Sequence, residues 1–236
     1  MITAVARFLR GLVRRFRAVM FFYRWRSETM KANGELTHAV VLVPGLMEPA
    51  RLMRNIDKRL KEAGFATYIF HVGLQTLLPY MVIRWRAIRT IRHIRQSFPQ
   101  LQRLDLVAHS LGGLLAMDVI RSGACDGLRI RLVTLGTAHR GTWMAVLGMW
   151  SLSAYQLFPF HPRYWLNSAS RCAQSVTHLS IAGTSDWLAP KERCNSPHAK
   201  NVLAHTGHSG LLTDSGVQAA ILVFLKDPQP SPPIGG

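Results

Sequence analysis

Residues 108–113 read Ala-His-Ser-Leu-Gly-Gly, and they span the junction between a mostly apolar run at 104–109 and a helical pattern. The apolar run predicts a buried strand, which places the serine on a tight turn from a strand into a helix. Bulky residues two positions away on either side would clash in such a turn, and Ala108 and Gly112 are both small. The turn raises the hydroxyl above the sheet edge, where the helix N-terminus favours developing negative charge. Ser110 is therefore a candidate nucleophile, and a purely structural turn is the alternative.

The rest of the chain alternates short apolar runs with helical patterns, as α/β proteins do. The runs are apolar on both faces, which indicates parallel strands that helices cover on both sides. Strands are predicted at residues 38–43, 67–70, 104–109, 129–135, 176–182 and 200–204. Helices are predicted at residues 51–63, 81–98, 111–120 and 214–226. The expected fold class is α/β, with a mostly parallel sheet and helices on both faces.

A serine hydroxyl is a poor nucleophile, so it needs a base, and the base needs a carboxylate to orient it. Asp186 comes just past the end of a predicted strand, where parallel sheets place their active sites. His208 lies in a loop between the last strand and the last helix, whereas His205 is expected to end its strand. Taken alone, Asp186 also fits a turn and His208 an exposed loop. The order and placement of Ser110, Asp186 and His208 favour a catalytic triad.

Two backbone N–H groups are candidates for an oxyanion hole. One belongs to Leu111, directly after the serine, and the other to Leu46, after the first core strand. Gly45 lets the backbone approach the acyl oxygen. A Pro-Gly pair also ends many strands for purely structural reasons, so residues 44–46 carry the assignment only together with the turn at Ser110.

Three stretches of the sequence resemble the α/β-hydrolase superfamily, and within it the small bacterial lipases and esterases. They are Pro44-Gly45-Leu46, residues 108–113, and residues 135–142, which read Leu-Gly-Thr-Ala-His-Arg-Gly-Thr. Many lipases have His-Gly-Leu at the first stretch, Gly in place of Ala108, and Gly-Thr-Pro-His-x-Gly at the third. The resemblance covers about residues 38–226. It implies an α/β-hydrolase fold and ester hydrolysis by Ser110, Asp186 and His208, and no metal or cofactor is implied.

The segment after Thr142 is apolar on nearly every side, and in α/β-hydrolases this region often forms a cap or acyl pocket. A lipid-like acyl chain would suit it, with Trp143, Met144, Leu147 and Trp187 as candidate substrate-binding residues. A buried core helix fits the segment equally well. The function expected is hydrolysis of lipid-like or other apolar acyl esters. Acyl transfer by the same triad, and a non-catalytic membrane-associated protein, remain as alternatives.

The chain has 29 Lys and Arg against 12 Asp and Glu among its 236 residues, a net charge of +17. Residues 1–26 contain seven arginines and no acidic residue, and their apolar and basic positions predict a helix with two opposite faces. Such a helix suits an anionic membrane surface. A helix packed on its own domain, or a targeting segment such as a mitochondrial transit peptide, fits as well.

A second arginine cluster lies within residues 81–98, but no phosphate loop, zinc spacing or RNA-binding signature accompanies it, and no nucleic-acid partner is expected. The sequence lacks a clear secretory signal peptide and an apolar window of about 18 residues, so the expected location is the cytoplasm, peripherally at the membrane. Nothing in the sequence indicates an oligomeric state.

The expected organisation has three parts. Residues 1–35 form the basic N-terminal helix, residues 36–227 form the hydrolase domain with a cap-like segment at 142–170, and the Pro-rich residues 228–236 are expected to be disordered. Three cysteines are too few for a disulfide framework or a metal site. Reduced thiols are favoured, and a bridge between Cys172 and Cys194 is the alternative.

Overall fold

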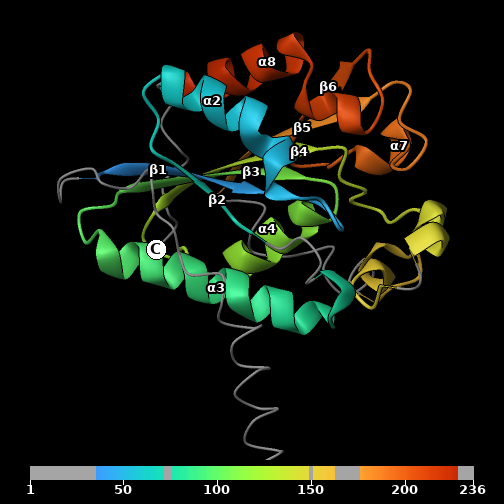
Figure 1. Ribbon diagram of the computed structural model, residues 1–236, viewed down its shortest axis with the longest axis horizontal. Coiled ribbons are helices and arrows are strands. Elements are labelled where there is room, and N and C mark those ends of the chain that lie inside the picture. Colours follow the sequence, from blue (N-terminus) through green and yellow to red (C-terminus); the bar gives the residue numbers. More distant parts are fainter. Residues whose placement is uncertain (1–35, 72–75, 149–150, 163–175, 228–236) are drawn as a thin grey trace, which may run out of the picture. The chain divides into compact units, whose positions relative to one another are not determined.

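The computed structural model describes residues 36–71, 76–148, 151–162 and 176–227. A six-stranded sheet with the strand order β2-β1-β3-β4-β5-β6 runs through it (Figure 1). Every neighbouring pair of strands in this sheet is parallel. The strands are β1 (His38–Val43), β2 (Thr67–Ile69), β3 (Arg103–His109), β4 (Arg129–Leu135), β5 (Val176–Gly183) and β6 (Lys200–Ala204). This sheet confirms the predicted fold class.

Helices cover both faces of the sheet. Helices α2 (Arg54–Glu62) and α8 (Ser215–Lys226) lie on one face, and α3 (Tyr80–Ser97) and α4 (Leu111–Arg121) lie on the other (Figure 1). The remaining elements are short: η1 (Ala50–Met53), η3 (Trp143–Gly148), η4 (Ala154–Leu157), α7 (Lys191–Cys194) and η5 (Ser209–Leu212). The predicted strands and long helices all form, with ends that shift by a few residues.

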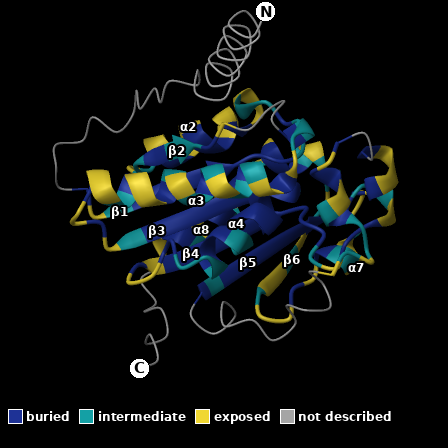
Figure 2. Ribbon diagram, turned by 90° about the horizontal axis from the view of Figure 1, so that it is seen from below, coloured by how far each residue is buried: buried dark blue, intermediate teal, exposed yellow. Residues whose placement is uncertain are grey.

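The core explains why the strand sequences do not alternate between apolar and polar residues. Successive side chains of a strand point to opposite faces of the sheet. In β1, Val40 and Leu42 pack into a cluster that includes Ile56 of α2 and Ile221 of α8. The intervening residue, Val41, lies beside α3 and α4 on the other face. The central strands are accordingly buried along nearly their whole length, while α3 exposes one side (Figure 2).

Each candidate site residue lies in the loop that follows one of four strands. The loops after β1, β3, β5 and β6 carry Leu46, Ser110, Asp186 and His208, respectively. Because all four strands run in the same direction, these loops emerge at one edge of the sheet. The sheet thus brings together residues that lie up to 162 positions apart in the chain, the separation of Leu46 and His208.

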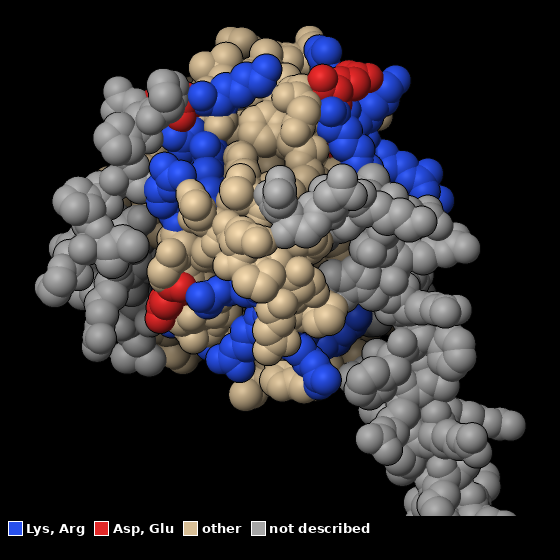
Figure 3. All heavy atoms as spheres, turned by 90° about the vertical axis from the view of Figure 1, so that its left-hand side faces the viewer, with Lys and Arg blue, Asp and Glu red and all other residues tan. Residues whose placement is uncertain are grey.

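Several predictions fall outside the described residues: the helix at 1–26, the tail at 228–236, Cys172, and the cap-like segment beyond 162. Membrane docking by residues 1–26 therefore stays a prediction. Cys125 and Cys194 are free, buried thiols. None of the helices in the described ranges combines the length and apolar character needed to cross a bilayer. On the face shown in Figure 3, basic side chains form separate groups with uncharged surface between them.

Candidate active site

Ser110 occupies a strained turn between β3 and α4. Its φ of 52° and ψ of −125° are unusual for a residue with a Cβ, and such strain is frequently retained at functional sites. The turn needs small neighbours, because a Cβ added to Gly112 would lie 2.4 Å from the carbonyl oxygen of Val43. Ala108 on the other side is fully buried. The structure therefore places Ser110 on the turn that the sequence predicts.

Asp186 and His208 form a hydrogen-bonded pair beside this turn. Nδ1 of His208 lies 2.7 Å from Oδ2 of Asp186, whose side chain is completely buried. The other carboxylate oxygen of Asp186 accepts the N–H of Ala189 at 2.8 Å. Because an ionised carboxylate only accepts hydrogen bonds, Nδ1 of His208 donates to Asp186, and in the neutral ring Nε2 then keeps the lone pair. This is the tautomer that a general base requires.

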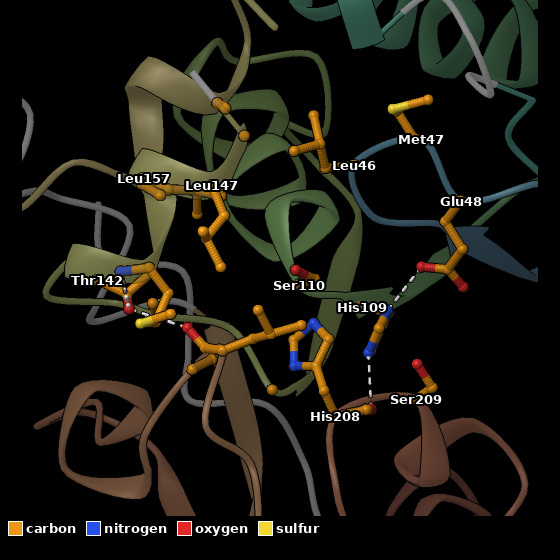
Figure 4. Close-up of a pocket in the computed structure, with 18 of the residues that line it drawn as sticks. Leu46, Met47, Glu48, His109, Ser110, Thr142, Leu147, Leu157, His208 and Ser209 are labelled. Carbon is orange, nitrogen blue, oxygen red and sulfur yellow. Dashed lines mark hydrogen bonds and ion pairs between the residues drawn. The ribbon is translucent and has the colours of Figure 1, made fainter. Parts of the chain in front are cut away.

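Ser110 and His208 line the same pocket, which has a volume of about 400 Å³. In Figure 4 the side chain of Ser110 points into the pocket, and the imidazole of His208 lies on the same side of the pocket. The structure thus brings Ser110 and His208 to one pocket, and Asp186 joins them through its hydrogen bond to His208. His205, in contrast, follows the end of β6 and is exposed.

The two candidate oxyanion donors lie on either side of Ser110. The loop that carries Leu46 comes so close to the serine turn that a Cβ on Gly45 would lie 2.9 Å from Cβ of Ser110. Among the described residues, no acceptor contacts the N–H of Leu46. Leu111 is the first residue of α4, so its N–H has no partner within the helix. Both N–H groups are available to an oxyanion.

The pocket wall is mostly apolar. Of the four predicted substrate-binding residues, two line it and two do not. Met144 and Leu147 of η3 line the pocket, as predicted. Trp143 and Trp187 do not, and their side chains are 51% and 61% exposed. The reason for Trp143 is that η3 is a 3-10 helix, in which residues three apart share a face, and Met144 and Leu147 occupy the face toward the pocket.

Trp143 instead packs edge-to-face against Phe158 and Phe160, outside the pocket. Trp187 follows Asp186 directly, and its side chain is exposed and does not line the pocket. The same wall contains residues that the sequence did not single out. They include Gly148, Ala154, Leu188 and Leu212.

Glu48 is a further residue of the site that no sequence motif predicted. This residue is 7% exposed, and its Oε2 accepts the N–H of Gly45 at 2.7 Å. The same oxygen lies 2.6 Å from Nδ1 of His109, the residue before the candidate nucleophile. A signal was present, because Glu48 is an acidic residue in an otherwise apolar loop beside the proposed oxyanion donor.

Comparisons with known proteins identify the fold. No protein-family model matches this chain, and no curated protein matches it in sequence. The mature lipase BlEst2 of Bacillus licheniformis is similar in structure, with a TM-score of 0.66 and 16% identity over 79% of this chain and 91% of that chain. Lipase B of Aspergillus fumigatus gives a TM-score of 0.63 and 13% identity over 86% of this chain and 56% of that chain.

A monoacylglycerol lipase of Paleococcus ferrophilus gives a TM-score of 0.57 and 16% identity over 79% of this chain and 93% of that chain. At these identities the likeness establishes the fold and not the reaction. Together with the sheet order and the serine turn, it shows that this chain has the α/β-hydrolase fold.

Proposed function

We propose that this protein is a serine hydrolase that cleaves esters of apolar acyl groups. The observation that carries the proposal is the Asp186–His208 hydrogen bond beside the strained turn of Ser110, at one apolar pocket. A nucleophile, a base in the required tautomer and an orienting carboxylate are the parts that acyl transfer to water needs.

In the proposed reaction, the hydroxyl of Ser110 attacks the ester carbonyl while Nε2 of His208 takes its proton. Asp186 stabilises the imidazolium that forms. The N–H groups of Leu46 and Leu111 donate to the oxyanion of the tetrahedral intermediate. The imidazolium then protonates the leaving alcohol, and a water molecule that His208 activates releases the acyl group from Ser110.

The pocket supports an apolar acyl group. Its volume of about 400 Å³ falls within the usual range of ligand pockets, roughly 300–1,000 Å³, and leucine, methionine and alanine side chains form most of its wall. Transfer of an acyl chain from water into such a wall gains about 0.8 kcal/mol for each methylene that is buried.

Covalent labelling with a fluorophosphonate tests the proposal. The wild-type protein is expected to react at Ser110, because the reagent needs an activated serine, and Ser110→Ala is expected to lose all labelling. Ser209→Ala is the matched control, since Ser209 lines the same pocket but has no role in the proposed reaction. Undiminished labelling of Ser110→Ala would overturn the assignment.

Replacement of Ala154 with leucine is expected to shorten the acyl chain that the enzyme accepts. Ala154 lines the pocket, and a Cβ added to the neighbouring Gly148 would lie only 3.1 Å from Cβ of Ala154, so this part of the wall is already tight. If a longer side chain there excludes four methylenes, the loss is about 3 kcal/mol, or roughly 100-fold in kcat/KM.

The measurement is kcat/KM for a series of p-nitrophenyl esters from acetate to decanoate. Ala154→Leu should keep acetate hydrolysis and lose octanoate hydrolysis. Leu152→Ala, an exposed position on the same segment, should leave the chain-length profile unchanged. An Ala154→Leu profile that matches the wild type would show that acyl chains bind elsewhere.

A further inference from the structure

A second histidine–carboxylate pair lies beside the candidate triad. Glu48 and His109 are 7% and 4% exposed, and their side chains meet at 2.6 Å between Oε2 and Nδ1. The other ring nitrogen of His109, Nε2, lies 3.2 Å from the backbone carbonyl oxygen of His208 (Figure 4). The rings of His109 and His208 are 4.6 Å apart between centroids.

These contacts join three of the four loops that carry the candidate site residues. Glu48 belongs to the loop after β1, and its Oε2 also accepts the N–H of Gly45, next to the oxyanion donor Leu46. His109 is the last residue of β3 and directly precedes Ser110. The carbonyl that His109 contacts belongs to the base, His208. One chain of hydrogen bonds, buried except at its His208 end, therefore runs from the loop after β1 that carries Leu46 (the oxyanion loop), past the nucleophile, to the base.

The chemistry of the partners fixes most of the hydrogens in this chain. A carbonyl oxygen only accepts, so Nε2–H of His109 donates to the carbonyl of His208. Nδ1 of His109 and Oε2 of Glu48 share a further proton. His109 thus needs a hydrogen on both sides, and a carboxylate at position 48 is the group that supports this state. In a buried setting such contacts are stronger than they are in water.

The oxyanion loop needs to be held in place. Met47, between Leu46 and Glu48, has a φ of 52°, a left-handed conformation that is strained for a residue with a side chain. Its N–H donates to Oγ1 of Thr76 at 2.8 Å. Glu48 fixes the other side of this strained residue through Gly45 and His109.

We propose that Glu48 and His109 are positioning residues, which hold the N–H of Leu46 and the ring of His208 in their reactive places around Ser110. The inference rests on the proposed function. It predicts an effect on kcat and not on KM, because neither Leu46 N–H nor His208 needs to be in place for an apolar acyl chain to enter the pocket. Loss of one oxyanion donor costs about 100-fold in kcat, and a misplaced base has a similar effect.

Glu48→Gln is the sharpest variant. If the amide oxygen takes the place of Oε2, it still accepts the N–H of Gly45 and Nδ1–H of a neutral His109. Nε2 of that neutral ring then has no hydrogen to donate to the carbonyl of His208. We expect Glu48→Gln and His109→Gln each to lower kcat about 100-fold with KM roughly unchanged, as a displaced catalytic geometry does.

The double variant Glu48→Gln/His109→Gln separates this chain from two independent packing contacts. Residues that act as a unit lose no more together than they do singly, so its kcat should match that of the worse single variant. Each kcat is calculated from the concentration of active sites that fluorophosphonate titrates, so that unfolded molecules are not counted.

His38→Gln is the matched control. His38 also contacts a buried carboxylate, with Nε2 2.8 Å from Oδ2 of Asp105, but at the opposite end of β1 from Glu48. It should leave kcat unchanged. The positioning role would be overturned if the Glu48 and His109 variants kept the kcat of the wild type, or if their losses multiplied in the double variant. Either result would leave the proposed function standing. If the wild-type protein hydrolyses no ester, and fluorophosphonate labels it no faster than Ser110→Ala, the proposed function fails and this inference fails with it.

Discussion

Replacement of Asp186 with asparagine is expected to lower kcat for ester hydrolysis about 10⁴-fold, the size of effect seen when a triad histidine is held in the wrong tautomer. Oδ1 of Asp186 accepts the N–H of Ala189 at 2.8 Å, and asparagine keeps this contact only if its oxygen occupies that position. The amide NH₂ then faces Nδ1 of His208, where Oδ2 now lies at 2.7 Å. Nδ1 must accept that hydrogen bond, so the ring hydrogen moves to Nε2, and His208 can no longer take the proton of Ser110.

The same contact keeps the variant folded, because the turn at residues 186–189 retains its hydrogen bond. Asp214→Asn serves as the control. Asp214 caps α8 through the N–H of Val217 at 2.8 Å and lies outside the pocket, so its replacement should leave kcat unchanged. Steady-state kinetics on a soluble short-chain ester measure both effects. Full turnover by Asp186→Asn would mean that a different acid orients the base.

The serine turn and the sheet could be predicted because their requirements are local. The turn needs small residues at fixed offsets, and Ala108 and Gly112 supply them. A strand that is buried on both faces needs an unbroken apolar run, as in residues 39–43. Even β6, an edge strand with exposed positions, was predictable at Lys200–Ala204. The α/β fold class is therefore confirmed in strand positions and direction, while the catalytic roles stay proposals.

The parts that could not be predicted depend on contacts between distant residues or on the choice of helix type. Glu48 and His109 are 61 positions apart, and no spacing rule links them. Whether Trp143 or Met144 faces the pocket depends on whether the apolar segment winds as an α-helix or a 3-10 helix, and composition does not decide this. The short helix α7 has only four residues, too few for a periodic pattern.

The histidine of the lipase-like stretch at 135–142 illustrates the same limit. The resemblance draws attention to His139, yet this residue does not line the pocket. It follows the end of β4 and is half-buried, with Nε2 3.1 Å from Oγ1 of Thr134, and the same hydroxyl lies 2.9 Å from Nε2 of His178 on β5. Its environment indicates a contribution to stability.

Mild acid is expected to destabilise the protein through these two histidines. Burial lowers the pKa of His139 to about 3, and the neighbouring His178 lowers it further in the same direction. Burial also lowers the pKa of His178, to about 4. Nδ1 of His139 is buried and has no partner among the described residues, so a proton added there would remain unpaired.

The sign follows from proton binding. Unfolded histidine has a pKa near 6.5, so between about pH 6.5 and pH 4 the unfolded chain binds protons at these positions that the folded protein does not bind. The contribution of these two histidines to the free energy of unfolding is therefore fully present above pH 6.5. It is lost as the pH drops toward their pKa values in the folded protein. His178 alone accounts for a loss of about 3 kcal/mol by pH 4, at about 1.4 kcal/mol for each unit of pKa difference.

Urea unfolding of the wild type and of His139→Gln/His178→Gln, near pH 7.5 and near pH 4.5, measures this loss. Glutamine can still bond to the hydroxyl of Thr134 but does not titrate, so the wild type should lose at least about 2 kcal/mol more than the variant between the two conditions. Carboxylates that titrate in the same range contribute equally to both proteins. His198→Gln, at an exposed histidine, should behave as the wild type does. Equal losses in the wild type and the double variant would show that these two histidines do not set the acid limit, and ring-proton NMR of folded wild type would then show them titrating near their ordinary pKa.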